Sequence, residues 1–118
     1  MKHASIVALC LLATNLACTD SRSLPAGSPD TQLQFLFNNY WQLRMKESPT
    51  RATYLGDHRY DDQLDDLSET ARIIGINQRR AMLKQLDAIN VAAASKANRY
   101  SAEILRRTLE DDIEESEL

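Results

Sequence analysis

The chain has 118 residues, a formal net charge of −3 and 43% hydrophobic residues. This length is enough for one small hydrophobic core but marginal for a complete enzyme domain. Nucleic-acid binding requires Lys and Arg clustered on one face, whereas the arginine pairs at 79–80 and 106–107 are isolated. We interpret both pairs as solvated helix faces and expect no nucleic-acid partner.

Residues 1–17 have the pattern of a bacterial export signal. A positive start at Met1–His3 precedes an apolar run, Ala4–Leu16, that is too short to span a bilayer as a mature helix. Cys18 resembles the lipidated cysteine of a bacterial lipobox. Asn15 stands where leucine is usual, so cleavage after Ala17 by the ordinary signal peptidase is the alternative. We favour a lipid on Cys18, because this cysteine has no partner for a structural disulfide.

Residues 18–29 predict a flexible linker or lipid tether. The segment is rich in Ser, Pro, Gly and Asp, which bury too little apolar surface to stay ordered. Thr19 in place of Asp directly after Cys18 resembles the pattern of lipoproteins sorted to the outer membrane. We therefore predict an exported protein on the periplasmic side of the bacterial envelope, anchored to the outer membrane by its lipid.

Residues 30–118 predict an all-α domain of about three long helices and one short helix. The first long helix is expected to open near Asp30 or Thr31 and to close before Pro49. Its apolar face, with Trp41 beside it, consists of Leu33, Leu36, Phe37, Tyr40 and Leu43. Ser48 can cap the short helix, Pro49 suits its first position, and Gly56 can end it in the left-handed conformation.

Two further long helices are expected to begin at Ser68 and near Ser95. The first has a predicted apolar stripe of Ala71, Ile74, Ala81, Met82, Leu86 and Ile89, with Leu83 at its shoulder. The second places Ile104, Leu105, Thr108 and Leu109 on one arc and Glu103, Arg106, Arg107, Glu110 and Glu114 on the other.

The last turns are crowded with Glu110, Asp111, Asp112, Glu114, Glu115 and Glu117. The negative end of a helix dipole disfavours acidic side chains by a few tenths of a kcal/mol each. We interpret the region as a helix cut short within a longer reading frame. The alternative is a frayed, solvated acidic tail.

The segment 49–68, PTRATYLGDHRYDDQLDDLS, combines a single histidine with many carboxylates. His58 with Asp57, Asp61, Asp62, Asp65 and Asp66 could in principle hold a divalent cation. The spacing is not diagnostic, because the chain has no His-Glu-x-x-His helix and no cysteine pair. We therefore predict no metal ligand, no catalytic residue and no cofactor in this chain.

The same segment and the helix before it supply a possible cleft or structural motif. Its candidate residues are Tyr40, Trp41, Tyr54, Gly56, His58, Tyr60, Asp61 and Asp62. We expect the aromatic side chains to pack between the first long helix and the short one. The alternative is a groove that binds a ligand or peptide.

These residues resemble the N-terminal region of the bacterial domain-of-unknown-function family numbered 885. The family's opening has Tyr-Trp, then Pro-x-x-Ala-Thr-x-x-Gly, then Tyr-Asp-Asp-x-Leu. Matching positions are Tyr40, Trp41, Pro49, Ala52, Thr53, Gly56, Tyr60, Asp61, Asp62 and Leu64. The resemblance covers nearly all of the chain after the leader. It implies members several times longer that look like zinc-dependent peptidases, with a His-Glu-type metal signature far downstream.

Two functions follow as hypotheses. The first is the N-terminal helical fragment of an exported metallopeptidase-like lipoprotein, which lacks the metal-binding part and is not catalytic alone. Its partners would be the membrane, through the lipid on Cys18, and the missing C-terminal part of the family domain. The second is a stand-alone helical lipoprotein that binds a protein partner.

Overall fold

The computed structural model describes residues 23–118, and within them it has helices and no strand. The elements are α1 (Pro29–Glu47), α2 (Pro49–Tyr54), the 3-10 turn η1 (His58–Tyr60), α3 (Glu69–Ala88), the 3-10 turn η2 (Val91–Ala93) and α4 (Lys96–Glu117). The prediction of an all-α fold with three long helices and one short helix is confirmed. The expected export signal, Cys18 and the first part of the expected linker lie outside the described residues.

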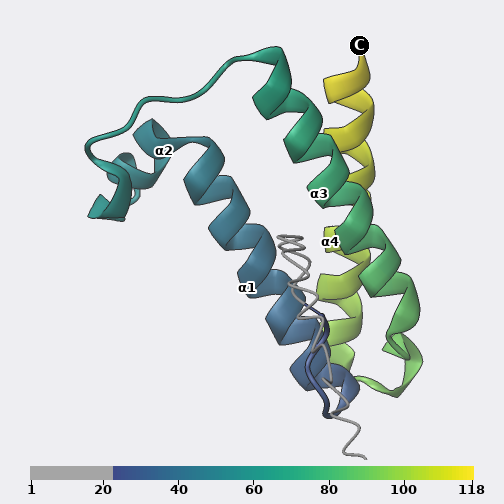
Figure 1. Cartoon of the computed structure of the whole chain (residues 1–118). Coiled ribbons are helices and arrows are strands. Elements are labelled where there is room, and N and C mark those ends of the chain that lie inside the picture. Colours follow the sequence, from purple (N-terminus) through teal and green to yellow (C-terminus); the bar gives the residue numbers. More distant parts are fainter. Residues whose placement is uncertain (1–22) are drawn as a thin grey trace, which may run out of the picture.

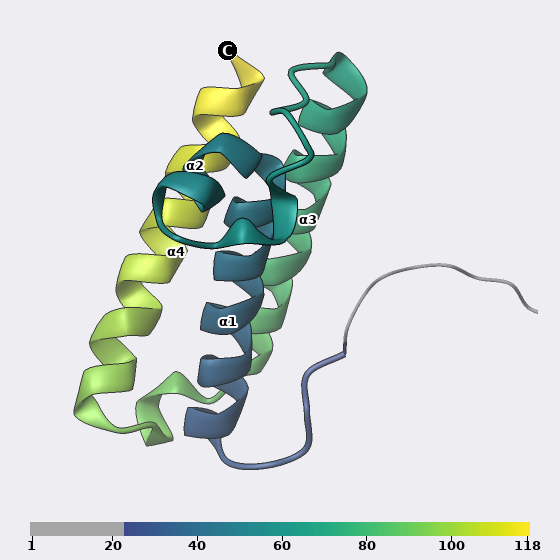
Figure 2. The ribbon, with the colours of Figure 1, turned by 90° about the vertical axis from the view of Figure 1, so that its left-hand side faces the viewer.

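The three long helices lie side by side, with α3 running opposite to α1 and α4 (Figure 1). The most extensive contact joins α3 to α4, which follow each other through the short connection that contains η2. α2 and η1 lie beside the C-terminal end of α1, away from the connection between α3 and α4 (Figures 1 and 2). The segment 49–68, with α2 and η1, therefore lies at one end of a three-helix bundle.

Local sequence explains where the long helices begin. Ser28, Ser68 and Ser95 each accept a hydrogen bond from the backbone N–H three residues later, at the starts of α1, α3 and α4. α1 begins at Pro29, one residue before the expected range, and proline suits this first position. The cap predicted at Ser68 and the beginning of α4 after Ser95 are confirmed.

The short helix is capped differently from the prediction. Ser48 makes no side-chain cap, because its hydroxyl donates instead to Asp65 Oδ2 at 2.7 Å. Gly56 has a φ of +87°, as predicted for the residue that ends this helix. The chain therefore turns at Gly56 into the acidic loop.

One hydrophobic core joins α1, α3 and α4. Its buried residues are Leu33, Leu36, Leu86, Ile89, Ala94, Ala102, Leu105 and Leu109. Leu24 packs against this core, and the Gln32 side chain donates to the carbonyl of Pro25. The described end of the expected linker is thus attached to the bundle.

Two of the predicted apolar faces were partly wrong. Ile74 is 52% exposed and Ile104 is 66% exposed, although both were placed on the apolar faces of their helices. Ile76 and Ala102 are buried instead. Adjacent apolar residues offer several possible faces, and the partners in the bundle decide which face is buried.

Arg79 is the buried centre of a partly buried polar cluster that joins the three long helices. Its guanidinium donates to both Glu47 carboxylate oxygens at 2.6 Å, and its Nε donates to Asp112 Oδ2 at 3.1 Å. The Tyr40 hydroxyl donates to the same Asp112 oxygen at 3.0 Å, and Arg44 lies 3.5 Å from it. We call these five residues the Arg79 cluster. Arg79 is only 6% exposed, so its interpretation as a solvated residue was wrong.

The surroundings of the cluster shift two pKa values. The pKa of Arg79 is raised because Glu47 accepts its hydrogen bonds, which outweighs the opposing effect of burial. The pKa of the Tyr40 hydroxyl is raised by burial first and then by the Asp112 carboxylate. Both residues therefore keep their protons in the folded protein at neutral pH.

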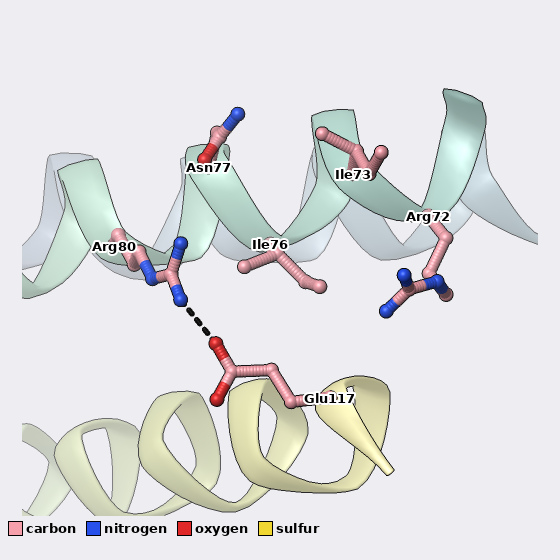
Figure 3. Close-up of a pocket in the computed structure, with 6 residues that line it drawn as sticks. All are labelled: Arg72, Ile73, Ile76, Asn77, Arg80 and Glu117. Carbon is pink, nitrogen blue, oxygen red and sulfur yellow. Dashed lines mark hydrogen bonds and ion pairs between the residues drawn. The ribbon is translucent and has the colours of Figure 1, made fainter. Parts of the chain in front are cut away.

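The acidic C-terminal turns are held by α3. Arg72 donates to the backbone carbonyl of Ser116, and Arg80 forms an ion pair with Glu117. Figure 3 shows this pair beside a hollow of about 250 Å³ between the two helices. α4 remains helical to Glu117, and Glu110, Asp111, Glu114, Glu115 and Glu117 are exposed to solvent.

Replacing Arg79 by Ala should lower the free energy of unfolding by about 3 kcal/mol, because Glu47 and Asp112 lose their shared cation. Urea denaturation followed by circular dichroism measures this change. Arg80 is the matched control. Its ion pair is about half exposed, so Arg80→Ala should change stability by less than about 1 kcal/mol. Equal losses in the two variants would contradict the buried cluster.

Gly75 makes room for the contact between Glu47 and Arg79. A Cβ atom there would lie 2.6 Å from Glu47 Oε1 and 3.0 Å from Arg79 Nη1. Gly75→Ala should therefore destabilise the protein by about 1 kcal/mol, although Ala is the better helix former by a similar amount.

The sign of this effect should reverse when Glu47 is removed. In a Glu47→Ala background, Gly75→Ala should stabilise the protein by up to about 1 kcal/mol. Urea denaturation of the four proteins of this double-mutant cycle gives the coupling. If Gly75→Ala changes stability equally in both backgrounds, the contact between Glu47 and Arg79 does not depend on a glycine at position 75.

Candidate functional site

The acidic loop after α2 is held in shape by its own aspartates. Asp65 accepts hydrogen bonds from Ser48 Oγ at 2.7 Å and from Thr50 N and Oγ1 at 3.1 and 2.9 Å. Asp61 accepts a hydrogen bond from Thr53 Oγ1 at 2.6 Å. These bonds lower the pKa of both carboxyl groups, with the Ser48 and Thr53 hydroxyls as the main causes. The loop is therefore folded onto α2 by carboxylate hydrogen bonds.

Arg59 is fixed at the end of α1 by three partners. Its Nε and Nη2 atoms donate to the two Asp57 carboxylate oxygens at 2.8 and 2.5 Å, and Nη2 also donates to Gln42 Oε1 at 2.8 Å. Its guanidinium carbon lies 5.4 Å from the centre of the Tyr60 ring. The hydrogen bonds from Arg59 lower the pKa of Asp57 to about 2.

The residues of this segment do not fit a zinc ion. His58 Nδ1 lies 2.8 Å from Asp61 Oδ2. The Asp57 carboxylate instead accepts a hydrogen bond from Arg59, and the Asp65 carboxylate accepts one from Thr50. No three His, Cys, Asp or Glu side chains in residues 23–118 are placed to hold a metal together. Structural and catalytic zinc sites need three or four such ligands at one point.

The candidate cleft residues lie in several different places. Tyr40 belongs to the Arg79 cluster, Trp41 is half-exposed, and Tyr60 faces the space between α1 and α3. Tyr54 is 88% exposed, so the expected packing between the helices was wrong for this residue. Gly56, His58, Asp61 and Asp62 are exposed in the acidic loop, where the His58 and Asp61 side chains are hydrogen-bonded to each other.

A groove of about 760 Å³ lies between α1 and α3 and reaches η1. Its lining residues are Asn38, Asn39, Gln42, Leu43, Lys46, Arg59, Tyr60, Ile74, Asn77, Gln78, Ala81, Met82 and Gln85. Six of these thirteen residues carry side-chain amides, so we call it the amide groove. Its volume falls in the range of ligand-binding clefts in proteins.

Sequence reasoning did not find the amide groove. Asn38, Gln42 and Lys46 recur at four-residue intervals along α1, and this spacing places them in one row on the helix. This polar row on α1 could have been recognised in the sequence as one side of a polar groove. The facing row on α3 could not be paired with it before the packing of the two helices was known.

Fold and groove together define a class, namely a small all-α protein with an interhelical, amide-lined groove. Residues 49–118 match the family described as "Bacterial protein of unknown function (DUF885)", and the chain belongs to this family. The match begins at Pro49, so Tyr40 and Trp41, which we had included in the resemblance, lie outside it. No curated protein matches the chain, and no solved structure matches it.

Within residues 23–118, no helix combines the length and apolar character needed to cross a membrane. A spanning helix requires about 20 consecutive, mostly apolar residues.

Arg59→Gln should raise the pKa of Asp57 from about 2 towards its ordinary value of 3.8, because the Arg59 hydrogen bonds are the largest cause of the shift. An NMR titration of the Asp57 carboxyl carbon measures this. The folded-state pKa is depressed, so the ion pair stabilises the loop above about pH 4 and this contribution is lost as the pH falls towards about 2. Arg51→Gln on α2 is the control and should leave the titration unchanged. A pKa that stays near 2 without Arg59 would contradict the assignment.

Proposed function

We propose that this chain is the N-terminal helical segment of an exported, metallopeptidase-like protein of its family. In this proposal the segment is not catalytic alone, and the zinc ligands come from another part of the parent protein. A lipid on Cys18 attaches it to the periplasmic side of the envelope, at the outer membrane. Family membership over residues 49–118 supports the proposal.

One observation carries the proposal, namely the exposed apolar side chains within the family-matched residues. Leu64 and Leu67 are almost fully exposed, and Ile73 and Ile74 on α3 are about half exposed. All four lie within residues 64–74 of the chain, and a covering protein part would bury apolar side chains that are left in water here. A larger helical body packed against the start of α3 would remove Leu64, Leu67 and Ile73 from water.

The second candidate function is a stand-alone helical lipoprotein that binds a protein partner. The closed core and the Arg79 cluster favour it, because the three long helices already bury their main apolar residues against one another. In this case the exposed apolar residues would form a surface for a separate protein.

The gene itself tests the first proposal. We expect the DNA beyond the codon for Leu118 to encode, in a continuing or nearby frame, more of the family domain with a His-Glu metal signature. Sequencing that region is the measurement. DNA without such a coding segment would contradict the fragment and favour the stand-alone protein.

The membrane anchor is tested separately, by expressing the chain in the bacterium that carries the gene. A fatty-acid label should enter the chain, and Cys18→Ser should abolish both the label and membrane retention, whereas Cys10→Ser should change neither. Label in the Cys18→Ser variant, or none in the natural chain, would contradict the lipid.

A further inference from the structure

We propose that the amide groove binds an extended, acidic polypeptide segment of a partner protein. This inference stands apart from the function proposed above, because neither family membership nor the lipid assigns a ligand to the groove. It depends on the hydrogen-bonding groups, the spacing and the charge of the lining residues.

Side-chain amides are concentrated in the groove. Residues 23–118 contain five Asn and six Gln, and six of these eleven side chains line it. Asn38, Asn39, Asn77 and Gln78 make no side-chain hydrogen bond to any other described residue. A carboxamide carries one acceptor oxygen and two N–H donors, which match the N–H and C=O groups of a polypeptide backbone. The groove therefore offers hydrogen bonds that a backbone can use along its length.

The spacing on α1 matches an extended chain. Asn38, Gln42 and Lys46 follow at four-residue intervals, which corresponds to about 6 Å along a helix axis. An extended polypeptide repeats every two residues, at about 6.6 Å. Side chains in this row can therefore meet alternate residues of one extended segment.

The charge of the lining selects an acidic segment. Lys46 and Arg59 are its two cations, and no Asp or Glu lines the groove, although the whole chain has a net charge of −3. Asp57 and Gln42 hold Arg59 in place, and the ion pair with Asp57 balances the charge of Arg59. Lys46, in the last turn of α1, makes no ion pair with another described residue. Carboxylates of the bound segment would therefore lie at the η1 end of the groove.

The remaining wall of the groove is apolar. Ile74, Ala81 and Met82 from α3 and Leu43 from α1 line it. In an extended segment, successive side chains point to opposite sides. One set can then contact this apolar wall while the backbone meets the amides.

A fluorescent peptide of alternating Ser and Glu tests the proposal, with about eight residues so that it spans the row. Anisotropy measured with the full chain should show saturable binding. The peptide with Gln in place of Glu should bind about tenfold more weakly. Lys46→Met should weaken binding of the Glu peptide about tenfold, as expected for the loss of one charged hydrogen bond.

Matched variants separate the groove from general surface effects. Lys84→Met removes an exposed lysine of α3 outside the groove and should leave binding unchanged. Asn38→Ala should weaken binding several-fold, whereas Gln63→Ala in the acidic loop should not. Circular dichroism should show all four variants folded, because each replaces a side chain outside the core.

Three results would overturn the proposal. These are the absence of peptide binding, equal losses for Lys46→Met and Lys84→Met, and tighter binding of an oligosaccharide of uronic acids than of the Glu peptide. The last result would assign the groove to an acidic carbohydrate, which shares the carboxylates but has no peptide backbone.

Discussion

The buried guanidinium of Arg79 is the interaction on which the arrangement of the bundle depends. A buried cation is strongly unfavourable unless carboxylates and hydrogen bonds compensate it. Glu47 comes from α1 and Asp112 from α4, so one side chain of α3 fixes both neighbouring helices. Sliding or rotating either helix would separate a charge from its partner. Burial of the apolar core holds the three long helices together, and the Arg79 cluster fixes how far α1 and α4 are shifted along α3.

The cluster also positions the candidate site. Glu47 is the last residue of α1, and α2 begins two residues later at Pro49. Because Arg79 holds Glu47, the C-terminal end of α1 is held against α3 at the level of Gly75. The turn into α2 and the loop that carries Arg59 start from this fixed point. The width of the amide groove near η1 therefore depends on the contact between Glu47 of α1 and Arg79 of α3.

Much of the fold could be predicted from local sequence, because serine caps, a first-turn proline and a glycine with positive φ act within a few residues. Ser68, Pro49 and Gly56 were identified in this way. The buried faces of α3 and α4 were harder to predict, because Ile73, Ile74 and Ile76 give the same periodic signal on several faces. Arg79 could not be predicted, because its partners lie 32 and 33 residues away along the chain.

The carboxylates of the acidic loop form hydrogen bonds and an ion pair within residues 48–65. Its carboxylates could have been metal ligands, yet Asp65 and Asp61 accept hydrogen bonds from α2, and Asp57 pairs with Arg59. This local use of negative charge keeps the carboxylates out of the groove lining. A chain with a net negative charge thus presents a groove whose lining has no carboxylate and has Lys46 as a cation without an ion-pair partner among the described residues. Because electrostatic selection depends on the charges that line a site, the groove favours an anionic segment even though the whole chain is acidic.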